Sequence, residues 1–253
     1  MPKLRTRIIP VLLLSGQGLV KTRKFRHPTY LGDPVNTVRI FNDMEVDELI
    51  LLDIRATRSG NILQFDSLRE IAAESLFPLA YGGGVRRIED AVRVIESGFE
   101  RIVLNTVCAT DPRAVREMCA ELGSSSIVAS MDVGNCWLRG EVVKVEGGHT
   151  TVKSGIEDWA RRIEDLGVGE IMVNVIERDG EMCGYDLNLV RRVSSAVSVP
   201  VIACGGASSF ADFSTALKAG AAAAAGGAVF VFKGKHRGVL IQYPRQADRE
   251  GVL

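Results

Sequence analysis

Short apolar runs alternate with longer segments of helical periodicity along the whole chain. The runs are "RIIPVLLL", "ELILLDI", "PLAYGGG", "RIVLNT", "SIVASMDV", "EIMVNVI", "PVIACGG" and "AAAAAGGAVF". Segments between them, such as "RIEDAVRVIESGF", place apolar residues three and four positions apart, as amphipathic helices do. Apolar strands separated by helices indicate a parallel sheet covered by helices. About eight such units in 253 residues predict an α/β fold, a (β/α)8 barrel forming a single domain over residues 1–253, with an open doubly wound sheet as the alternative.

The two halves of the chain repeat each other. "DELILLDIRAT" aligns with "GEIMVNVIERD", and "PLAYGGGVRRIEDAVRVIESG" aligns with "PVIACGGASSFADFSTALKAG", with about 120 positions between partners. Two half-barrels of one design would produce this repeat, which favours closure of the sheet. By the same alignment Leu13, at the end of the first strand, is the counterpart of Asp132, at the end of the fifth.

Charge and apolar patterning exclude several classes of partner. The 31 basic residues equal the 31 acidic ones, so no overall field would draw the chain to nucleic acid or to an anionic membrane. No apolar run approaches the roughly 20 residues that cross a bilayer, and "IIPVLLL" is too short for a signal peptide and contains Pro10. Five scattered cysteines without a C-x-x-C pair suggest neither zinc nor a dithiol. We expect a cytoplasmic protein without a metal, a cofactor, a nucleic-acid partner or membrane association.

Glycine turns follow corresponding strands of the two halves. Gly83 and Gly84 follow the third apolar run, and Gly205 and Gly206 follow the seventh. Glycine lets a ligand approach the backbone closely, and amides at the start of a helix attract phosphate. The paired loops suggest two phosphates on one extended ligand, although each loop alone fits a tight strand-to-helix turn equally well.

The two predicted anion sites differ in their side chains. Asn105 and Thr106 follow the fourth run, whereas the matching residues after the eighth run are Gly227 and Ala228. The second site therefore lacks side-chain donors. We expect it to bind an anion more weakly, through backbone amides, or to bind a different anion.

Polar residues at strand ends are the candidates for chemistry, because the active site of an α/β barrel lies at the carboxyl ends of its strands. Asp132 is the leading catalytic candidate; the others are Asp53, Asn174, Glu177 and Asp179. Each of them could instead be a loop cap. The sequence contains no G-x-S-x-G, H-E-x-x-H or G-x-x-x-x-G-K-[ST] pattern, and "GQGLVK" fits a turn in a loop.

The segments "RIIP", "GDPV", "DELILLDI", "GGGVR", "LNT", "GYDLNL" and "IACGGA" resemble the HisF family, the cyclase subunit of imidazole glycerol phosphate synthase, over nearly the whole chain. The resemblance implies a (β/α)8 barrel that receives ammonia from a glutaminase, HisH, and cyclises a ribulosyl nucleotide with two phosphates. The second of the family's two catalytic aspartates matches Asp132, and Leu13 stands in the place of the first. Lys21 matches a lysine of the family's mobile first loop.

The resemblance also implies which residues surround the ligand and which admit ammonia. The expected ligand-binding residues are Lys21, Asp53, Gly83, Gly84, Asn105, Thr106, Asn174, Asp179, Gly180, Gly205, Gly206 and Gly227. A ring of alternating charges at the base of the barrel, an ammonia gate in the family, matches Arg7, Glu48, Arg101 and Glu170, with arginine replacing the usual lysine at Arg101. Without the resemblance, charges at strand starts would be read as solvated rim residues.

Departures from the family pattern indicate a branch of it. "PVLLLSGQGLVKTRKF", "AYGGG" and "FKGKHRGVLIQYP" resemble HisF-like WbuZ proteins of surface-polysaccharide clusters, which are associated with a HisH-like glutaminase and an N-sugar amidotransferase that turns an acetamido into an acetamidino group. Leu13 fits this branch, because losing one acid–base group typically lowers turnover about 10²–10⁴-fold. We therefore expect an ammonia-relaying subunit. The alternatives are the histidine-pathway cyclase and a phosphate-binding scaffold without ammonia transfer.

Overall fold

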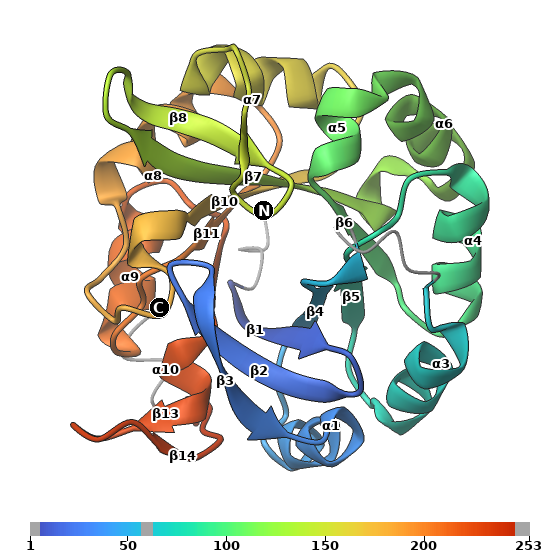
Figure 1. Cartoon of the computed structure of the whole chain (residues 1–253), viewed down its shortest axis with the longest axis vertical. Helices are drawn as coiled ribbons and strands as arrows, with labels where there is room; N and C mark the ends of the chain where they lie inside the picture. The colour runs from blue at the N-terminus through green and yellow to red at the C-terminus, as the bar shows by residue number, and fades with distance from the viewer. Residues whose placement is uncertain (1–5, 57–62, 246–253) are drawn as a thin grey trace, which may run out of the picture.

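Eight parallel strands close into a barrel in the computed structural model, which describes residues 6–56 and 63–245. β1 pairs with β4 on one side and with β12 on the other, and β7 pairs with β10, so the ring of strands is complete (Figure 1). The barrel strands are β1 (Arg7–Ser15), β4 (Leu49–Asp53), β5 (Leu79–Gly82), β6 (Arg101–Leu104), β7 (Ile127–Cys136), β10 (Glu170–Val175), β11 (Val201–Cys204) and β12 (Ala223–Gly226). The predicted (β/α)8 barrel is confirmed.

Helices follow the barrel strands and cover their outer side. The Asp33 carboxylate accepts the backbone N–H of Asn36 at 2.8 Å at the start of α1, and Asp111 accepts that of Ala114 at 3.2 Å at the start of α6. The helices are α1 (Pro34–Asp43), α3 (Phe65–Glu74), α4 (Ile88–Glu96), α5 (Thr106–Thr110), α6 (Pro112–Leu122), α7 (Ile156–Glu164), α8 (Leu187–Ala196), α9 (Ala211–Lys218) and α10 (Ala228–Val231), with short turns η1 (Ser124–Ser126) and η2 (Ile176–Arg178). Within the described residues, none of them has the length and apolar character that crossing a membrane requires.

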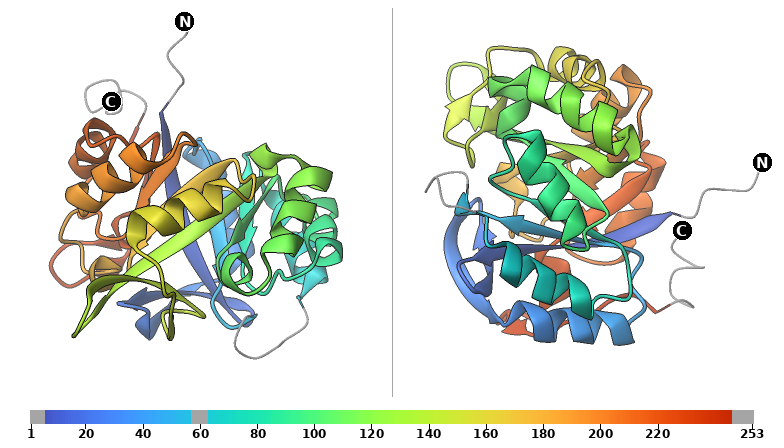
Figure 2. Two further views of the ribbon diagram at one scale, coloured as in Figure 1. Left: turned by 90° about the horizontal axis from the view of Figure 1, so that it is seen from above. Right: turned by 90° about the vertical axis from the view of Figure 1, so that its right-hand side faces the viewer.

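Antiparallel hairpins extend the barrel beyond its carboxyl end. β2 (Gly18–Arg23) pairs with β1 and with β3 (Arg26–Gly32), and β8 (Gly140–Val145) pairs with β7 and with β9 (Thr150–Thr151). Figure 2 shows both hairpins at the end of the barrel away from the start of β1. A further small hairpin joins β13 (Phe232–Lys233) and β14 (Gly238–Val239).

These hairpins correct two expectations from the sequence. Gly16 and Gln17 do form the turn predicted for "GQGLVK", but the residues from Gly18 onward form a strand rather than a loop. The first and fifth barrel strands also run past Leu13 and Asp132, where they were predicted to end, because each continues into antiparallel pairing with its hairpin.

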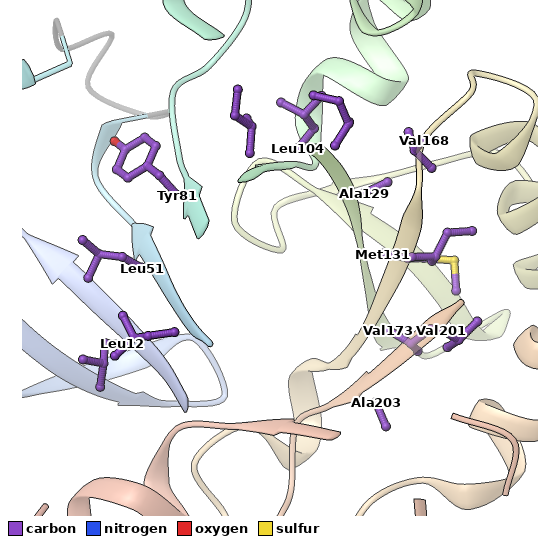
Figure 3. Close-up of a cluster of buried hydrophobic side chains, with 14 of the residues drawn as sticks. Leu12, Leu51, Tyr81, Leu104, Ala129, Met131, Val168, Val173, Val201 and Ala203 are labelled. Carbon is purple, nitrogen blue, oxygen red and sulfur yellow. The ribbon is translucent and has the colours of Figure 1, made fainter. Parts of the chain in front are cut away.

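The barrel strands alternate their side chains between two apolar layers. Ile9, Val11 and Ile50 point into the barrel and belong to an inner cluster. Their neighbours Leu12 and Leu51 belong to an outer cluster that packs under the helices, and Figure 3 shows them with other members of that layer. Burial on both faces explains why these strands read as continuous apolar runs.

The end of the described chain is tied to the start of the barrel. The buried hydroxyl of Tyr243 lies 2.8 Å from the carbonyl oxygen of Ile8 and 3.0 Å from a carboxylate oxygen of Asp47. These contacts hold residues after β14 against the amino ends of β1 and β4.

Candidate active site and charge ring

A cavity of about 810 Å³ opens at the carboxyl ends of the barrel strands. The expected ligand-binding residues and Asp132 line it: Lys21, Asp53, Gly83, Gly84, Asn105, Thr106, Asp132, Asn174, Asp179, Gly180, Gly205, Gly206 and Gly227. Glu177, also a candidate for chemistry, is not part of this wall, and its carboxylate accepts the backbone N–H of Asn135 at 2.6 Å. The same wall contains residues that the sequence did not single out, including Thr22, Phe25, Leu52 and Ser130. Ser130 could have been found from strand periodicity, because it lies two positions before Asp132 on the same strand and its side chain therefore points to the same side.

Asp132 lies on the floor of this cavity and is 7% exposed. Its Oδ1 accepts hydrogen bonds from the Ser130 hydroxyl at 3.1 Å and the Asn174 amide at 3.4 Å. Its Oδ2 accepts one from the Asn105 amide at 3.2 Å. Burial raises the pKa of Asp132 to about 7, and the bonds from Ser130 and Asn174 oppose that shift. The carboxyl group can therefore gain or lose a proton near neutral pH.

The repeat relates a polar pair of residues in the cavity to an apolar pair. Asp132 is in register with Asn174 on the neighbouring strand, and Leu13 is in register with Leu52. Because the repeat makes Leu13 the counterpart of Asp132 and Leu52 that of Asn174, a polar pair in the second half matches an apolar pair in the first. Among the described residues, the buried Oδ1 of Asn174 has no hydrogen-bond partner, which leaves an acceptor beside Asp132 for a ligand donor.

Asn105 and Thr106 face partners within the protein. The Asn105 amide donates to the Ser130 carbonyl at 3.0 Å as well as to Asp132, so it supports the carboxyl group on the cavity floor. The Thr106 hydroxyl accepts the backbone N–H of Glu146 at 3.1 Å, which fixes the loop after β8. Both residues line the cavity, but these bonds orient their side chains before any ligand binds.

Close packing between neighbouring loops explains the paired glycines. A Cβ atom on Gly83 would lie 2.3 Å from the Asp53 carbonyl oxygen, and one on Gly206 would lie 2.1 Å from the Gly184 carbonyl oxygen. Both glycines also have positive φ, +116° and +110°. A loop of the preceding unit crosses each turn so closely that only glycine fits, and binding of phosphate there stays a prediction.

The β2–β3 hairpin is fastened to the loop after β10. Lys21 Nζ lies 2.6 Å from Asp179 Oδ1, and the Thr22 hydroxyl donates to Asp179 Oδ2 at 2.9 Å. Gly180 is needed for this approach, since a Cβ there would lie 2.2 Å from the Thr22 carbonyl oxygen. Asp53 has a different role. Its carboxylate accepts the backbone N–H of Arg55 at 2.8 Å and so caps the loop that follows β4.

Four charged side chains form a closed ring at the opposite end of the barrel. Arg7 contacts Glu48 at 2.7 Å and Glu170 at 2.6 Å. Arg101 contacts Glu170 at 2.9 Å and Glu48 at 3.8 Å, so positive and negative groups alternate. Burial raises the pKa of Glu48, which is 2% exposed, and the two arginines oppose that shift. The four residues predicted for the base of the barrel therefore lie together, and their role as a gate stays a prediction.

The part of the chain that the structure describes contains no group of three or more His, Cys, Asp or Glu side chains that could hold a metal ion. The cavity contains the carboxyl group of Asp132 with amide and hydroxyl groups around it, and Lys21 paired with Asp179. Its wall also includes Asp53, Arg86, Glu146 and His149.

Comparison with known proteins identifies the family. The family model "Histidine biosynthesis protein" matches residues 7–237. The chain is 45% identical over 241 residues to a Pseudomonas aeruginosa protein provisionally named imidazole glycerol phosphate synthase subunit hisF2, covering 95% of this chain and 96% of that one. It is 38% identical over 221 residues to imidazole glycerol phosphate synthase subunit HisF of Alkaliphilus metalliredigens, covering 87% of each chain. With its closed barrel, this chain belongs to the histidine biosynthesis protein family, among relatives of imidazole glycerol phosphate synthase subunit HisF.

Proposed function

We propose that the protein is an ammonia-relaying barrel subunit that works with a HisH-like glutaminase bound at the charge ring. The observation that carries the proposal is the combination of a closed ring of four charges at one end with a cavity at the other in which Leu13 replaces an acid. A phosphate-binding scaffold would use such a ring only for stability, whereas an ammonia relay also needs a closed entrance that can open. The missing acid argues against cyclisation, so delivery of ammonia is the function that both features support.

The interior of the barrel suits the passage of an uncharged molecule. The residues between the ring and the cavity are apolar and belong to the inner cluster: Ile9, Val11, Ile50, Ala80, Val103, Val128, Met172, Ile202, Cys204, Ala223 and Ala225. An ammonium ion would lose its hydration among such side chains at a large energetic cost, whereas uncharged ammonia would not. The alternating charges at the base would exclude ions and water, and one side chain would have to move to let ammonia pass.

Arg101 is the member of the ring best placed to move. It has one close contact, at 2.9 Å to Glu170, and one long contact, at 3.8 Å to Glu48. Arg7 has two close contacts, at 2.7 Å and 2.6 Å. Swinging Arg101 aside therefore breaks fewer short ion pairs than moving Arg7 does.

The cavity would receive ammonia beside a phosphorylated small molecule or a docked acceptor enzyme. Asp132, with a pKa raised to about 7, can take a proton from nitrogen as it attacks an electrophile. Gly83 and Gly84 lie where a phosphate of a ligand would meet the backbone. We propose that the relayed nitrogen serves amidation of a surface-polysaccharide sugar, acetamido to acetamidino, with an N-sugar amidotransferase.

The cyclase of histidine biosynthesis is the second candidate function. It is supported by the match to the histidine biosynthesis family and by the similarity to HisF subunits. Leu13 and Leu52 place two apolar side chains in register opposite the polar pair of the other half, so one acid–base group is missing. We expect conversion of the ribulosyl nucleotide to be at least about 10²-fold slower than in an authentic cyclase, even with ammonium salt supplied. Turnover within about tenfold of an authentic cyclase would favour that candidate instead.

The relay is tested in a complex reconstituted from this protein, the glutaminase and the amidotransferase, with a nucleotide-linked acetamido sugar as acceptor. Amidation of the sugar is measured with glutamine and, separately, with ammonium salt as the nitrogen source. Substituting Arg101→Ala should change amidation from glutamine while leaving amidation from ammonium salt unaltered. Arg69→Ala, which removes an exposed arginine from the outer surface, is the matched control and should change neither. Equal changes with both sources, or no change with either, would refute the gate.

A further inference from the structure

Two hairpins far apart in the sequence bring positive charges together beside the cavity. Residues 18–32, which contain β2 and β3, and residues 228–243, which contain β13 and β14, include no aspartate or glutamate. Besides the buried Lys21 they contain six cationic side chains, which we call the basic patch: Arg23, Lys24, Arg26, Lys233, Lys235 and Arg237. Since the whole chain has no net charge, this patch is a local excess of positive charge.

Glu181 joins the two hairpins. Arg23 donates two hydrogen bonds to its carboxylate, at 3.0 Å and 2.9 Å, and Arg237 donates to its carbonyl oxygen at 3.4 Å. The hydrogen bond from Arg23 lowers the pKa of Glu181, burial opposes that shift, and the charges of Lys24 and Arg237 add to it. Figure 1 shows both hairpins on the same side of the barrel. One acid therefore lies among several cations and cannot neutralise them all.

The basic patch borders the mouth of the cavity. Phe25, in the turn of the β2–β3 hairpin, lines the cavity, and so does Gly180, the neighbour of Glu181. Lys24 and Arg26, on either side of Phe25, are exposed. Whatever binds the basic patch therefore also covers part of the opening.

The β2–β3 hairpin keeps these charges at a cost to its own stability. Arg23 and Arg26 are direct cross-strand partners, and like charges in that position repel each other. The two residues between them, Lys24 and Phe25, both have positive φ, 51° and 61°, in a turn where asparagine and glycine are the unstrained choices. Side chains that are kept against repulsion and strain point to a binding role.

We propose that the basic patch docks an acidic surface of the enzyme that accepts the nitrogen, and so holds that enzyme over the mouth of the cavity. The inference rests on the proposed ammonia relay and deepens it by naming the surface that the acceptor enzyme contacts. Opposite charges steer two proteins together and fix their orientation. Tyr30, on β3, is 67% exposed, and both tyrosine and arginine are enriched in protein interfaces.

The position of the basic patch favours a protein over a membrane. An anionic lipid surface would also attract such a patch. It would cover the mouth of the cavity without offering an electrophile to the ammonia that leaves there. A docked enzyme would cover the same opening and supply the acceptor.

Binding of the N-sugar amidotransferase to the complex of this protein with its glutaminase, measured by surface plasmon resonance at low and at high salt, tests the proposal. The wild-type protein should bind more weakly at high salt, because salt screens exposed charges. Lys24→Glu combined with Lys235→Glu should weaken binding about tenfold or more at low salt, and the loss should shrink at high salt. The matched control reverses two exposed cations on outer helices, Arg116→Glu combined with Lys218→Glu, and should bind like wild type.

Each outcome decides for or against the docking surface. No binding of the amidotransferase by the wild-type protein, equal losses in the two double variants, or binding that salt does not weaken would overturn it. Vesicles of phosphatidylglycerol and phosphatidylethanolamine are a second probe. Vesicle binding that is lost in the Lys24 and Lys235 double variant, without binding of the amidotransferase, would assign the basic patch to a membrane and also overturn the proposal.

The docking surface and the ammonia relay can fail independently. Salt-sensitive docking without transfer of nitrogen from glutamine would uphold the docking surface and refute the relay. Transfer from glutamine that the double variant at the basic patch does not weaken, together with unchanged docking, would do the reverse.

Discussion

Replacing Asp132 by asparagine should remove a dependence of stability on pH. The pKa of Asp132 is raised from 3.8 to about 7, so between about pH 4 and pH 7 the folded protein keeps a proton that the unfolded chain has lost. Stability therefore falls as pH rises through this window. From pH 5 to pH 8 the window spans about two pKa units, which at about 1.4 kcal/mol each corresponds to about 3 kcal/mol. Asp132→Asn cannot titrate and should lack this loss.

Chemical denaturation followed by circular dichroism at pH 5, 6, 7 and 8 measures the effect. The free energy of unfolding of wild type minus that of Asp132→Asn should fall by about 3 kcal/mol across the series. At pH 5 the variant should be the less stable of the two, because an asparagine must present its amide nitrogen to one of the groups that donate to Asp132. Leu13→Asn is the control: it adds an amide to the same cavity at the equivalent position and should shift stability equally at every pH. If the free energy of unfolding changed with pH in the same way for wild type and Asp132→Asn, burial would not raise the pKa of Asp132.

Two further changes test the ring and the glycine turns. Arg7→Gln removes the close partner of the Glu48 carboxylate, which is 2% exposed and keeps only its 3.8 Å contact with Arg101, and should lower the free energy of unfolding by about 3 kcal/mol. Arg39→Gln, at an exposed pair, should lower it far less, and equal losses for the two variants would show that the ring is not buried. Gly206→Ala places Cβ 2.1 Å from a carbonyl oxygen and should lower the free energy of unfolding by about 3 kcal/mol or more. Gly140→Ala, at a position with positive φ and no atom within 4 Å, should lower it by about 1 kcal/mol. Equal losses for the two variants in chemical denaturation would assign the whole effect to backbone conformation.

The barrel could be predicted from the sequence, but its hairpins could not. Burial on both faces makes each barrel strand an apolar run, and the repeat favours closure of the series into a barrel. β2 and β3 contain "KTRKFRH" and pair mainly with each other, and the first five residues of β3 are exposed. β3 buries little and therefore carries no apolar signal. β2 buries Leu19 to Thr22, but two of these four residues are Lys21 and Thr22, so its sequence does not read as an apolar run.

The position of the site could be predicted from the strand ends in the sequence. The directions in which its side chains point could not. Knowing that strands end near Asp132 and Asp179 is enough to place both at one cavity. Whether the Asn105 amide faces a ligand or Asp132 depends on rotamers and on the neighbouring carbonyl of Ser130. The contact between Lys21 and Asp179 joins residues 158 positions apart, and depends on how the hairpin folds over the barrel.

The contact of Tyr243 with Ile8 has a practical consequence for labelling this protein. It brings both ends of the described chain to the face that contains the charge ring, so a reporter attached next to Thr6 or Arg245 would crowd that face. The β7–β8 hairpin reaches the far end of the barrel (Figure 2). Trp137 and Leu138, in the turn between its strands, are 96% and 80% exposed. A reporter inserted between them would leave the ring accessible.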